Sequence, residues 1–217
     1  MSAPLPLRAI RRVARNFHLG TNERYLQWHL RHAGVADADN IKSYTTPEEL
    51  RKLFELAAAC PPGANVLEIG SHLGASTCFL GAALAPLGGH LFCVDTWHNE
   101  TMPEGEQDTF SVFKRNTNGL NGVLNLLRKR SDTLQEEEIT LPLQLAFLDG
   151  DHSYESTKKD FDLVAPWIDA NGTVVFHDCI YFEGVSRVIG EALAGGQWRV
   201  AGHVGNLFWI KRAKWRR

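Results

Sequence analysis

The sequence predicts an α/β fold built on a doubly wound sheet of seven strands, which is mostly parallel and ends in an antiparallel hairpin. From residue 45 onward, short strands alternate with helical segments, and most of these strands are apolar throughout. This pattern is typical of parallel strands whose two faces are both covered by helices. Near the C-terminal end, two strands are separated only by Val204-Gly205-Asn206, and so short a connection predicts an antiparallel hairpin.

The predicted elements follow one another in a regular order. Thr46 as N-cap and Pro47 at the first helical position predict a helix that ends before the break at Pro61-Pro62-Gly63. Strands are expected at residues 65–69, 90–94, 125–129, 143–148, 173–176, 198–203 and 207–211. Helices are expected at residues 74–84, 108–118, 154–164 and 185–193, with a weak helical turn at 136–138. Right-handed crossovers between the parallel strands then give a doubly wound, Rossmann-like topology.

Length and composition set the expected domain organisation. With 217 residues and 44% hydrophobic content, the chain can bury one sizeable core. We expect residues 1–44 to form a helical accessory segment and residues 45–217 to form the main domain. Four arginines and apolar residues at helical spacing predict a basic amphipathic helix over residues 1–20. Such a helix docks on its own domain, on a second copy of the chain in a homo-oligomer, or on a membrane surface.

Charge, cysteine usage and hydropathy narrow the class of protein. The formal net charge of −2 gives no electrostatic reason to expect nucleic acid as a partner, so small-molecule chemistry is expected. The four cysteines are scattered without a C-x-x-C pair, and we expect them to be reduced core residues. The sequence has neither an apolar run of about 18 residues nor a secretory signal, which predicts a cytoplasmic protein. The basic tail at residues 211–217 is expected to be a frayed end or a contact with anionic lipid.

A turn with two glycines follows the first predicted strand, in the sequence Glu68-Ile69-Gly70-Ser71-His72-Leu73-Gly74. Its backbone amides can approach a ligand in the crevice above the strand ends. The G-x-x-x-G spacing differs from the G-x-G-x-x-G of dinucleotide sites, and the carboxylate of Glu68 would repel two phosphates. Asp95 ends the second strand 21 residues after Gly74, a spacing that brings an acid to ribose hydroxyls. The alternative is an ordinary strand-to-helix turn with a solvated strand end.

Titratable side chains follow two further strands of the predicted sheet. Asp149-Gly150-Asp151-His152 comes after the strand at 143–148, and His177-Asp178 follows the strand at 173–176. Because carboxyl ends of parallel strands meet at one edge, we expect these groups to converge there. An imidazole with an ordinary pKa of about 6.5 suits a general base, and His152 is our first candidate. The alternative for the first group is an acidic N-cap of the following helix.

These motifs resemble a known family. Glu68-x-Gly70-x-x-x-Gly74 followed by Asp95-Thr96-Trp97 resembles the first two motifs of class I S-adenosylmethionine-dependent methyltransferases, and Ser131-Asp132 matches their usual adenine-side position. The blocks around Asp149 to Tyr154 and Gly172 to Asp178 resemble a bacterial subfamily similar to macrolide-sugar and cephalosporin-tailoring O-methyltransferases. The resemblance covers residues 45–212. It implies methyl transfer from S-adenosylmethionine to a hydroxyl of a small molecule, on a sugar or glycosylated natural product.

The resemblance also implies which residues act. The cofactor-binding residues are expected to be Glu68, Gly70, Ser71, Gly74, Ser76, Asp95, Thr96, Trp97, Ser131 and Asp149. The catalytic residues are expected to be His152, Asp149, His177 and Asp178. Asp149, Asp178 and His177 are candidate ligands for a divalent metal such as Mg²⁺, which would lower the pKa of a bound hydroxyl. Metal-dependent relatives usually present two oxygen ligands at the second block, whereas this chain has His177-Asp178-Cys179, so metal-free catalysis with His177 as base or substrate contact is the alternative.

Two further interpretations concern the surroundings of the site. The polar segment 98–108 follows the ribose acid and is expected to be a lid or a solvated acidic loop, while Trp97, Tyr181 and Phe182 are expected to provide apolar walls. Two other functions fit parts of the pattern. One is an NAD-dependent oxidoreductase on a related fold. The other is a non-catalytic cofactor-binding or membrane-docked protein that uses its basic ends.

Overall fold

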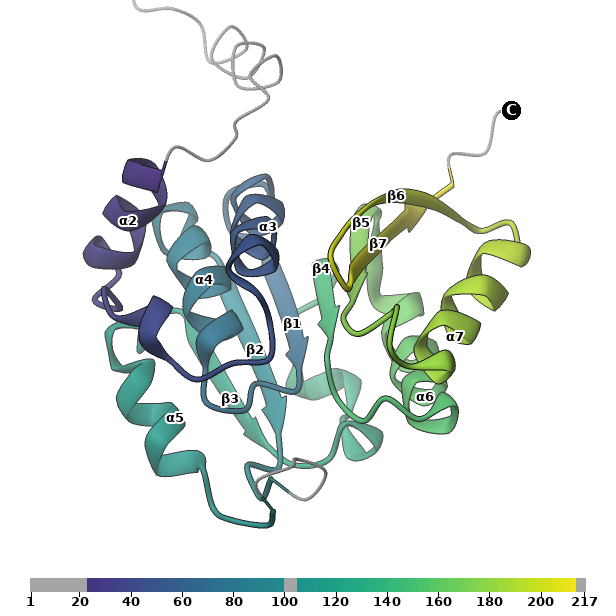
Figure 1. Ribbon diagram of the computed structural model, residues 1–217. Coiled ribbons are helices and arrows are strands. Elements are labelled where there is room, and N and C mark those ends of the chain that lie inside the picture. Colours follow the sequence, from purple (N-terminus) through teal and green to yellow (C-terminus); the bar gives the residue numbers. More distant parts are fainter. Residues whose placement is uncertain (1–22, 100–104, 214–217) are drawn as a thin grey trace, which may run out of the picture.

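The sheet carries the architecture, and the computed structural model describes it within residues 23–99 and 105–213 (Figure 1). Across these residues, seven strands form one sheet in the order β3-β2-β1-β4-β5-β7-β6. The strands are β1 (Asn65–Ile69), β2 (His90–Asp95), β3 (Leu124–Arg128), β4 (Leu143–Leu148), β5 (Ile168–Phe176), β6 (Trp198–Val204) and β7 (Leu207–Arg212). Strands β1 to β5 pair in parallel, and β7 pairs antiparallel with β5 and β6. The predicted sheet with its terminal hairpin is confirmed.

Helices cover both faces of this sheet. They are α2 (Glu23–His32), α3 (Pro47–Ala58), α4 (Ala75–Leu84), α5 (Phe110–Asn116), α6 (Tyr154–Val164) and α7 (Glu183–Ala194). In Figure 1, α2 to α5 lie on one side of the sheet and α6 and α7 on the other. Two separate apolar clusters match this division, one under each layer of helices. The doubly wound arrangement is therefore confirmed.

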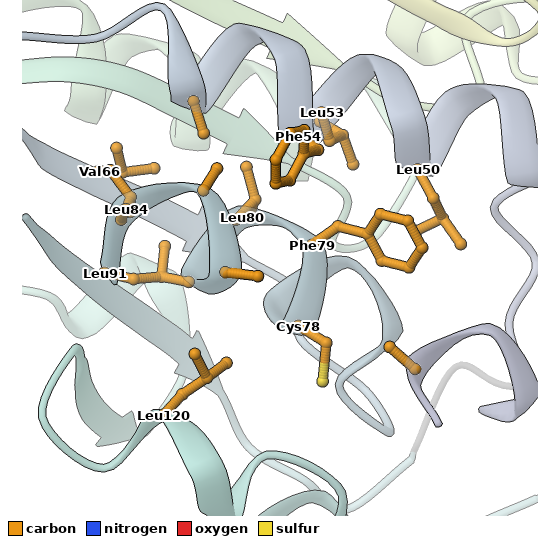
Figure 2. Close-up of a cluster of buried hydrophobic side chains, with 14 of the residues drawn as sticks. Leu50, Leu53, Phe54, Val66, Cys78, Phe79, Leu80, Leu84, Leu91 and Leu120 are labelled. Carbon is orange, nitrogen blue, oxygen red and sulfur yellow. The ribbon is translucent and has the colours of Figure 1, made fainter. Parts of the chain in front are cut away.

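Alternation along the strands explains how one sheet supports two cores. Every residue of β1 is buried, and Val66 faces the cluster under α3 and α4 while Leu67 faces the cluster under α6 and α7. Figure 2 shows the first cluster, in which Phe54 of α3 and Leu80 of α4 pack near Val66 of β1. Strands buried on both faces need apolar residues at successive positions, which is the pattern the sequence shows.

The start of α3 is determined locally. The side chain of Thr46 accepts a hydrogen bond from the amide of Glu49, the carboxylate of Glu49 accepts one from the amide of Thr46, and Pro47 occupies the first turn. This capping box satisfies amides that a helix leaves free at its N-terminus. The predicted start of this helix is confirmed, and it places Glu49 in the first turn at the N-terminal end of α3.

The structure differs from the prediction at two elements. Strand β5 begins at Ile168 instead of residue 173, because Ile168 pairs with Leu143 across an irregularity in the β4–β5 register. Asp169, Asn171 and Gly172 favour a turn locally, and the pairing overrides that preference. Helix α2 was not expected as a separate element, and its Leu26 and Leu30 are buried in the same cluster as α3 and α4. A domain division at residue 45 stays a prediction.

Several expectations concern other parts of the chain. The predicted basic helix over residues 1–20 and residues 214–217 of the basic tail lie outside the described residues. All four cysteines are free; Cys78 and Cys93 lie in the core as expected, whereas Cys60 and Cys179 are only half-buried. Among the described helices, none has the length and apolar character needed to cross a membrane.

Candidate active site

The turn after β1 brings the chain very close to the end of β4. Gly70 has a φ of 87°, and a Cβ atom at this position would lie 2.0 Å from the carbonyl oxygen of Asp149. The amide of Asp149 in turn donates to the carbonyl of Ile69 over 2.9 Å. At the other end of the turn, Gly74 (φ 93°) caps α4, and a Cβ there would meet Thr117 at 2.7 Å. Both predicted glycines are therefore needed for close packing as well as for their left-handed backbone.

Glu68 lies beneath this turn and does not reach the ligand side of it. Its carboxylate is fully buried and accepts hydrogen bonds from the hydroxyls of Ser71 (2.8 Å), Ser76 (2.6 Å) and Thr77 (2.5 Å). Burial raises the pKa of Glu68 to about 7, although the three hydroxyls oppose this shift. The predicted cofactor contact through Glu68 is thus replaced by a supporting role, in which the carboxylate fixes the turn and the start of α4.

Asp95 organises the same turn from β2. One carboxylate oxygen accepts from the amide of His72 at 2.8 Å, and the other accepts from the amide of Trp97 at 2.6 Å. The Asp95 side chain borders the large cavity at the strand ends, as predicted for a ribose-binding acid. It therefore links two loops that a nucleoside would contact.

Trp97 corrects the prediction of an apolar cofactor wall. Its backbone has a φ of 52°, and its fully buried side chain packs against Phe110 and Phe113 of α5, with ring centroids 4.8 and 4.7 Å apart. The indole does not border the cavity, because this left-handed turn and the packing of α5 place it in the core.

Of the predicted lid at 98–108, residues 100–104 lie outside the described residues. Asp108 pairs with Arg128 over 2.8 Å.

A cavity of about 630 Å³ opens at the carboxyl ends of the parallel strands, and its size suits a small-molecule ligand. The predicted cofactor residues that line it are Gly70, Ser71, Ser76, Asp95, Thr96, Ser131 and Asp149. Asp160 lines it as well and accepts a hydrogen bond from Ser131, and burial raises the pKa of Asp160 to about 6. Asp132 is not among the lining residues; it pairs over 2.9 Å with Arg130, which does line the cavity. The lining is consistent with a nucleoside held between the β1 and β3 ends.

The predicted catalytic side chains converge at one end of this cavity. Nε2 of His152 lies 3.5 Å from Oδ1 of Asp149 and 3.3 Å from Oδ2 of Asp178. Nδ1 of His177 lies 3.1 Å from the same Asp149 oxygen and 3.5 Å from the same Asp178 oxygen. Asp178 has a φ of 56°, a left-handed conformation that aspartate tolerates better than most residues. The two carboxylates therefore stand between two imidazoles.

A fifth residue, Glu49, completes the group and escaped the sequence analysis. Its Oε2 lies 3.3 Å from Nε2 of His177, and only 1% of either side chain is exposed. The pair joins residues 128 positions apart in the chain. The pattern Thr46-x-x-Glu49 indicates only a capping box, so no local signal distinguishes Glu49 from an ordinary helix cap.

The carboxylates set the electrostatics of the cluster. Burial alone would lower the pKa of His177, but Asp149 and Asp178 raise it to about 11. Burial likewise opposes ionisation of Asp149, yet the neighbouring His177 and His152 lower its pKa overall. The pKa of His152 is raised, because Asp149 and Asp178 outweigh its partial burial. His177 thus stays protonated at neutral pH, and the pKa of His152 is shifted in the same direction.

The cluster also contains a set of side chains that could hold a metal ion. Ligand atoms of Asp149, His152 and Asp178 all lie within 4.8 Å of one another. His177 was a predicted ligand, but it is not part of this set. Two carboxylates and one imidazole fit Mn²⁺ or Zn²⁺ better than Mg²⁺, which prefers oxygen ligands.

A glycine turn after β1, an acid at the end of β2 and an antiparallel terminal hairpin define a cofactor-binding α/β enzyme fold. A family model described as a methyltransferase domain matches residues 67–179, just over half of the chain. The chain belongs to this methyltransferase family. Its fold is that of class I S-adenosylmethionine-dependent methyltransferases, as the motifs predicted.

Solved structures share this fold, and one curated relative shares part of the sequence. The O-methyltransferase of Bacillus cereus, solved in complex with SAH, is similar with a TM-score of 0.62 and 18% identity, over 95% of this chain and 97% of that chain. CalS11, a TDP-rhamnose 3'-O-methyltransferase of calicheamicin biosynthesis, has a TM-score of 0.51 and 15% identity, over 94% and 92% of the two chains. The uncharacterized protein y4gI of Sinorhizobium fredii is 31% identical over 118 residues, which are 52% of this chain. The match spans only 13% of that curated relative.

Proposed function

We propose that this methyltransferase is O-directed and transfers the methyl group of S-adenosylmethionine to a hydroxyl of a sugar or glycosylated natural product. The observation that carries the proposal is His152, which lines the cavity while its buried Nε2 stands between Asp149 and Asp178. An alkyl hydroxyl is a weak nucleophile near pH 7, so its methylation needs a positioned base. Nitrogen or thiolate acceptors have less need of such a group.

Each residue at the site has a separate role. S-adenosylmethionine, when bound, supplies a methyl group on a sulfonium centre. His152 takes the hydroxyl proton on Nδ1, since its Nε2 faces Asp149 and Asp178, and these two carboxylates stabilise the imidazolium that forms. Phe182 stacks on His152 with ring centroids 4.4 Å apart and an interplanar angle of 30°, which limits rotation of the imidazole. His177 lines the cavity, but only 1% of its side chain is exposed and both of its ring nitrogens face carboxylates, so we assign it to positioning rather than to proton transfer.

The rim of the cavity supports a carbohydrate acceptor. Tyr181 and Phe182 follow Asp178 directly and line the cavity, although 76% and 43% of their surfaces are exposed. Tyr44 also lines the cavity and is 51% exposed. Aromatic faces bind the apolar C–H faces of sugar rings, while the nearby carboxylates suit the ring hydroxyls. The likeness to CalS11, which acts on a TDP-linked rhamnose, is consistent with this acceptor class.

The test is a screen of nucleotide sugars and glycosides with the purified protein and S-adenosylmethionine, read by mass spectrometry for a methyl ether. We expect His152→Ala to lower kcat by about 10² to 10⁴ without changing cofactor affinity, since general-base catalysis contributes that much. His90→Ala, which removes an exposed imidazole on β2, is the matched control. We also expect kcat to rise with pH through a pKa above 6.5, the direction in which the carboxylates shift His152. Full turnover by His152→Ala, or methylation confined to nitrogen acceptors, would contradict the proposal.

A further inference from the structure

Glu49 is buried more completely than a helix cap requires. Its neighbour Glu48 lies in the same first turn of α3 and is exposed, whereas only 1% of the Glu49 side chain is accessible. Ionisable carboxylates are rarely buried unless they are paired, because removal from water is costly. Satisfying the amide of Thr46 would need only a surface carboxylate. The burial of Glu49 therefore indicates partners beyond the helix.

Those partners come from two other elements. Oε1 of Glu49 accepts from the amide of Asn206, in the turn between β6 and β7, over 2.5 Å. A Cβ atom on Gly205 would lie 2.4 Å from the same oxygen, and Gly205 has a φ of 52°. Only glycine leaves the hairpin turn room for this carboxylate. Oε2 of Glu49 meets Nε2 of His177, at the end of β5, at 3.3 Å.

The contact with His177 fixes the orientation of an imidazole inside the catalytic group. With Nε2 held by Glu49, Nδ1 must face the Asp149 and Asp178 oxygens that also face His152. A histidine held at both nitrogens cannot rotate without breaking a buried contact. A continuous chain of polar contacts thus runs from the start of α3 to the proposed base.

We propose that Glu49 is a positioning residue of the methyl-transfer site: through His177, it holds Asp149 and Asp178 in the geometry that His152 needs. The proposal rests on the function proposed above for His152. Glu49 lies outside residues 67–179, the part matched by the family model. The site is therefore incomplete without the N-terminal end of α3.

The first experiment compares Glu49→Gln with the matched control Glu48→Gln. Glutamine keeps the size of the side chain and an oxygen for the Asn206 amide, but its NH₂ group replaces the charged oxygen that faces both His177 and the Thr46 amide. We expect Glu49→Gln to lower kcat by about 10- to 100-fold, the usual effect of losing a partner that orients a site group, with little change in the Kd of S-adenosylmethionine. Glu48→Gln should behave as the wild type. A folded Glu49→Gln protein with unchanged kcat would overturn the proposal.

A double-mutant cycle separates positioning from a general role in stability. If Glu49 acts through His177, Glu49→Gln should cost nothing further in kcat once His177→Asn is present. If Glu49 merely supports the fold, the two effects on kcat should multiply, and this outcome would overturn the proposal.

An acceptor-independent measurement keeps this test apart from the screen. In ¹⁵N-histidine-labelled protein, with the His177 signals assigned by their loss in His177→Asn, we expect the imidazole signals of His177 to change in Glu49→Gln but not in Glu48→Gln. If Glu49→Gln fails to fold, proton exchange measured on the wild-type protein still tests the proposal. A buried Nε2 proton of His177 that is bound to Glu49 should exchange slowly with solvent. Unchanged signals in Glu49→Gln, or rapid exchange in the wild type, would overturn the Glu49 proposal. Absence of activity on every hydroxyl acceptor would instead overturn the proposed function.

Discussion

Gly70 offers the sharpest test of how the cofactor turn and the catalytic end of β4 are joined. We consider Gly70→Ala beside Gly63→Ala as its control. Both glycines have a left-handed backbone, with φ of 87° and 71°. They differ in space, because a Cβ on Gly63 meets nothing within 4 Å, whereas a Cβ on Gly70 would lie 2.0 Å from the carbonyl oxygen of Asp149. The pair therefore separates backbone strain from steric overlap.

The expected magnitudes follow from these two terms. A non-glycine residue in the left-handed region costs about 1–2 kcal/mol, and this is the whole expected loss for Gly63→Ala. At Gly70 the new Cβ would overlap backbone atoms of Asp149, which no side-chain rotation can relieve. Either the turn after β1 or the end of β4 must therefore move by more than 1 Å to restore the roughly 3.4 Å of an ordinary contact. Overpacking of this kind adds about 1–3 kcal/mol. We expect Gly70→Ala to lose about 2–5 kcal/mol of unfolding free energy.

Equilibrium unfolding in urea measures both losses, and calorimetric titration with S-adenosylmethionine measures the consequence for the site. Since the shift moves the segment that carries Asp149, we expect Gly70→Ala to weaken cofactor binding while Gly63→Ala leaves it intact. Equal stability losses in the two variants, or unchanged cofactor affinity in Gly70→Ala, would refute the inference that this close approach builds the site.

Three other predictions concern the cofactor turn and the metal question. Asp95→Ala should weaken S-adenosylmethionine binding in a calorimetric titration, because the carboxylate orders the His72 and Trp97 amides, and an unchanged Kd would exclude that role. The raised pKa of Glu68, about 7 against an ordinary 4.5, means that its contribution to stability is complete below pH 4.5 and is lost as pH rises towards 7. Urea unfolding of wild type and Glu68→Gln should therefore differ in pH dependence by about 3 kcal/mol over this window, and parallel curves would contradict the shift. Dialysis against EDTA should leave methyl transfer intact, because the proposed proton transfer uses the His152 imidazole and no metal, whereas a tenfold loss that Mn²⁺, Zn²⁺ or Mg²⁺ reverses would place a metal at Asp149, His152 and Asp178.

The sequence predicts that four side chains converge after β4 and β5, because this depends only on the order of the strands and on where they end. These side chains are Asp149, His152, His177 and Asp178. Neighbouring parallel strands β4 and β5 finish at the same edge, so residues just after them must lie close together. Glu49 was not predictable in this way. Its contact with His177 depends on how α3 packs over the sheet and on where the β6–β7 turn lies, and neither is encoded in local pattern.

The sequence by itself determined the order of the elements, the mostly parallel sheet with its terminal hairpin, and the family of methyltransferases, because periodicity, turn residues and motif spacing are local properties. Only the tertiary structure decided which side chains of each motif face the cavity. Glu68 points beneath its turn to three hydroxyls, and Trp97 turns into the core under α5, while Asp95 faces the cavity between them. Those directions follow from backbone conformation and close packing, which depend on neighbours distant in the chain.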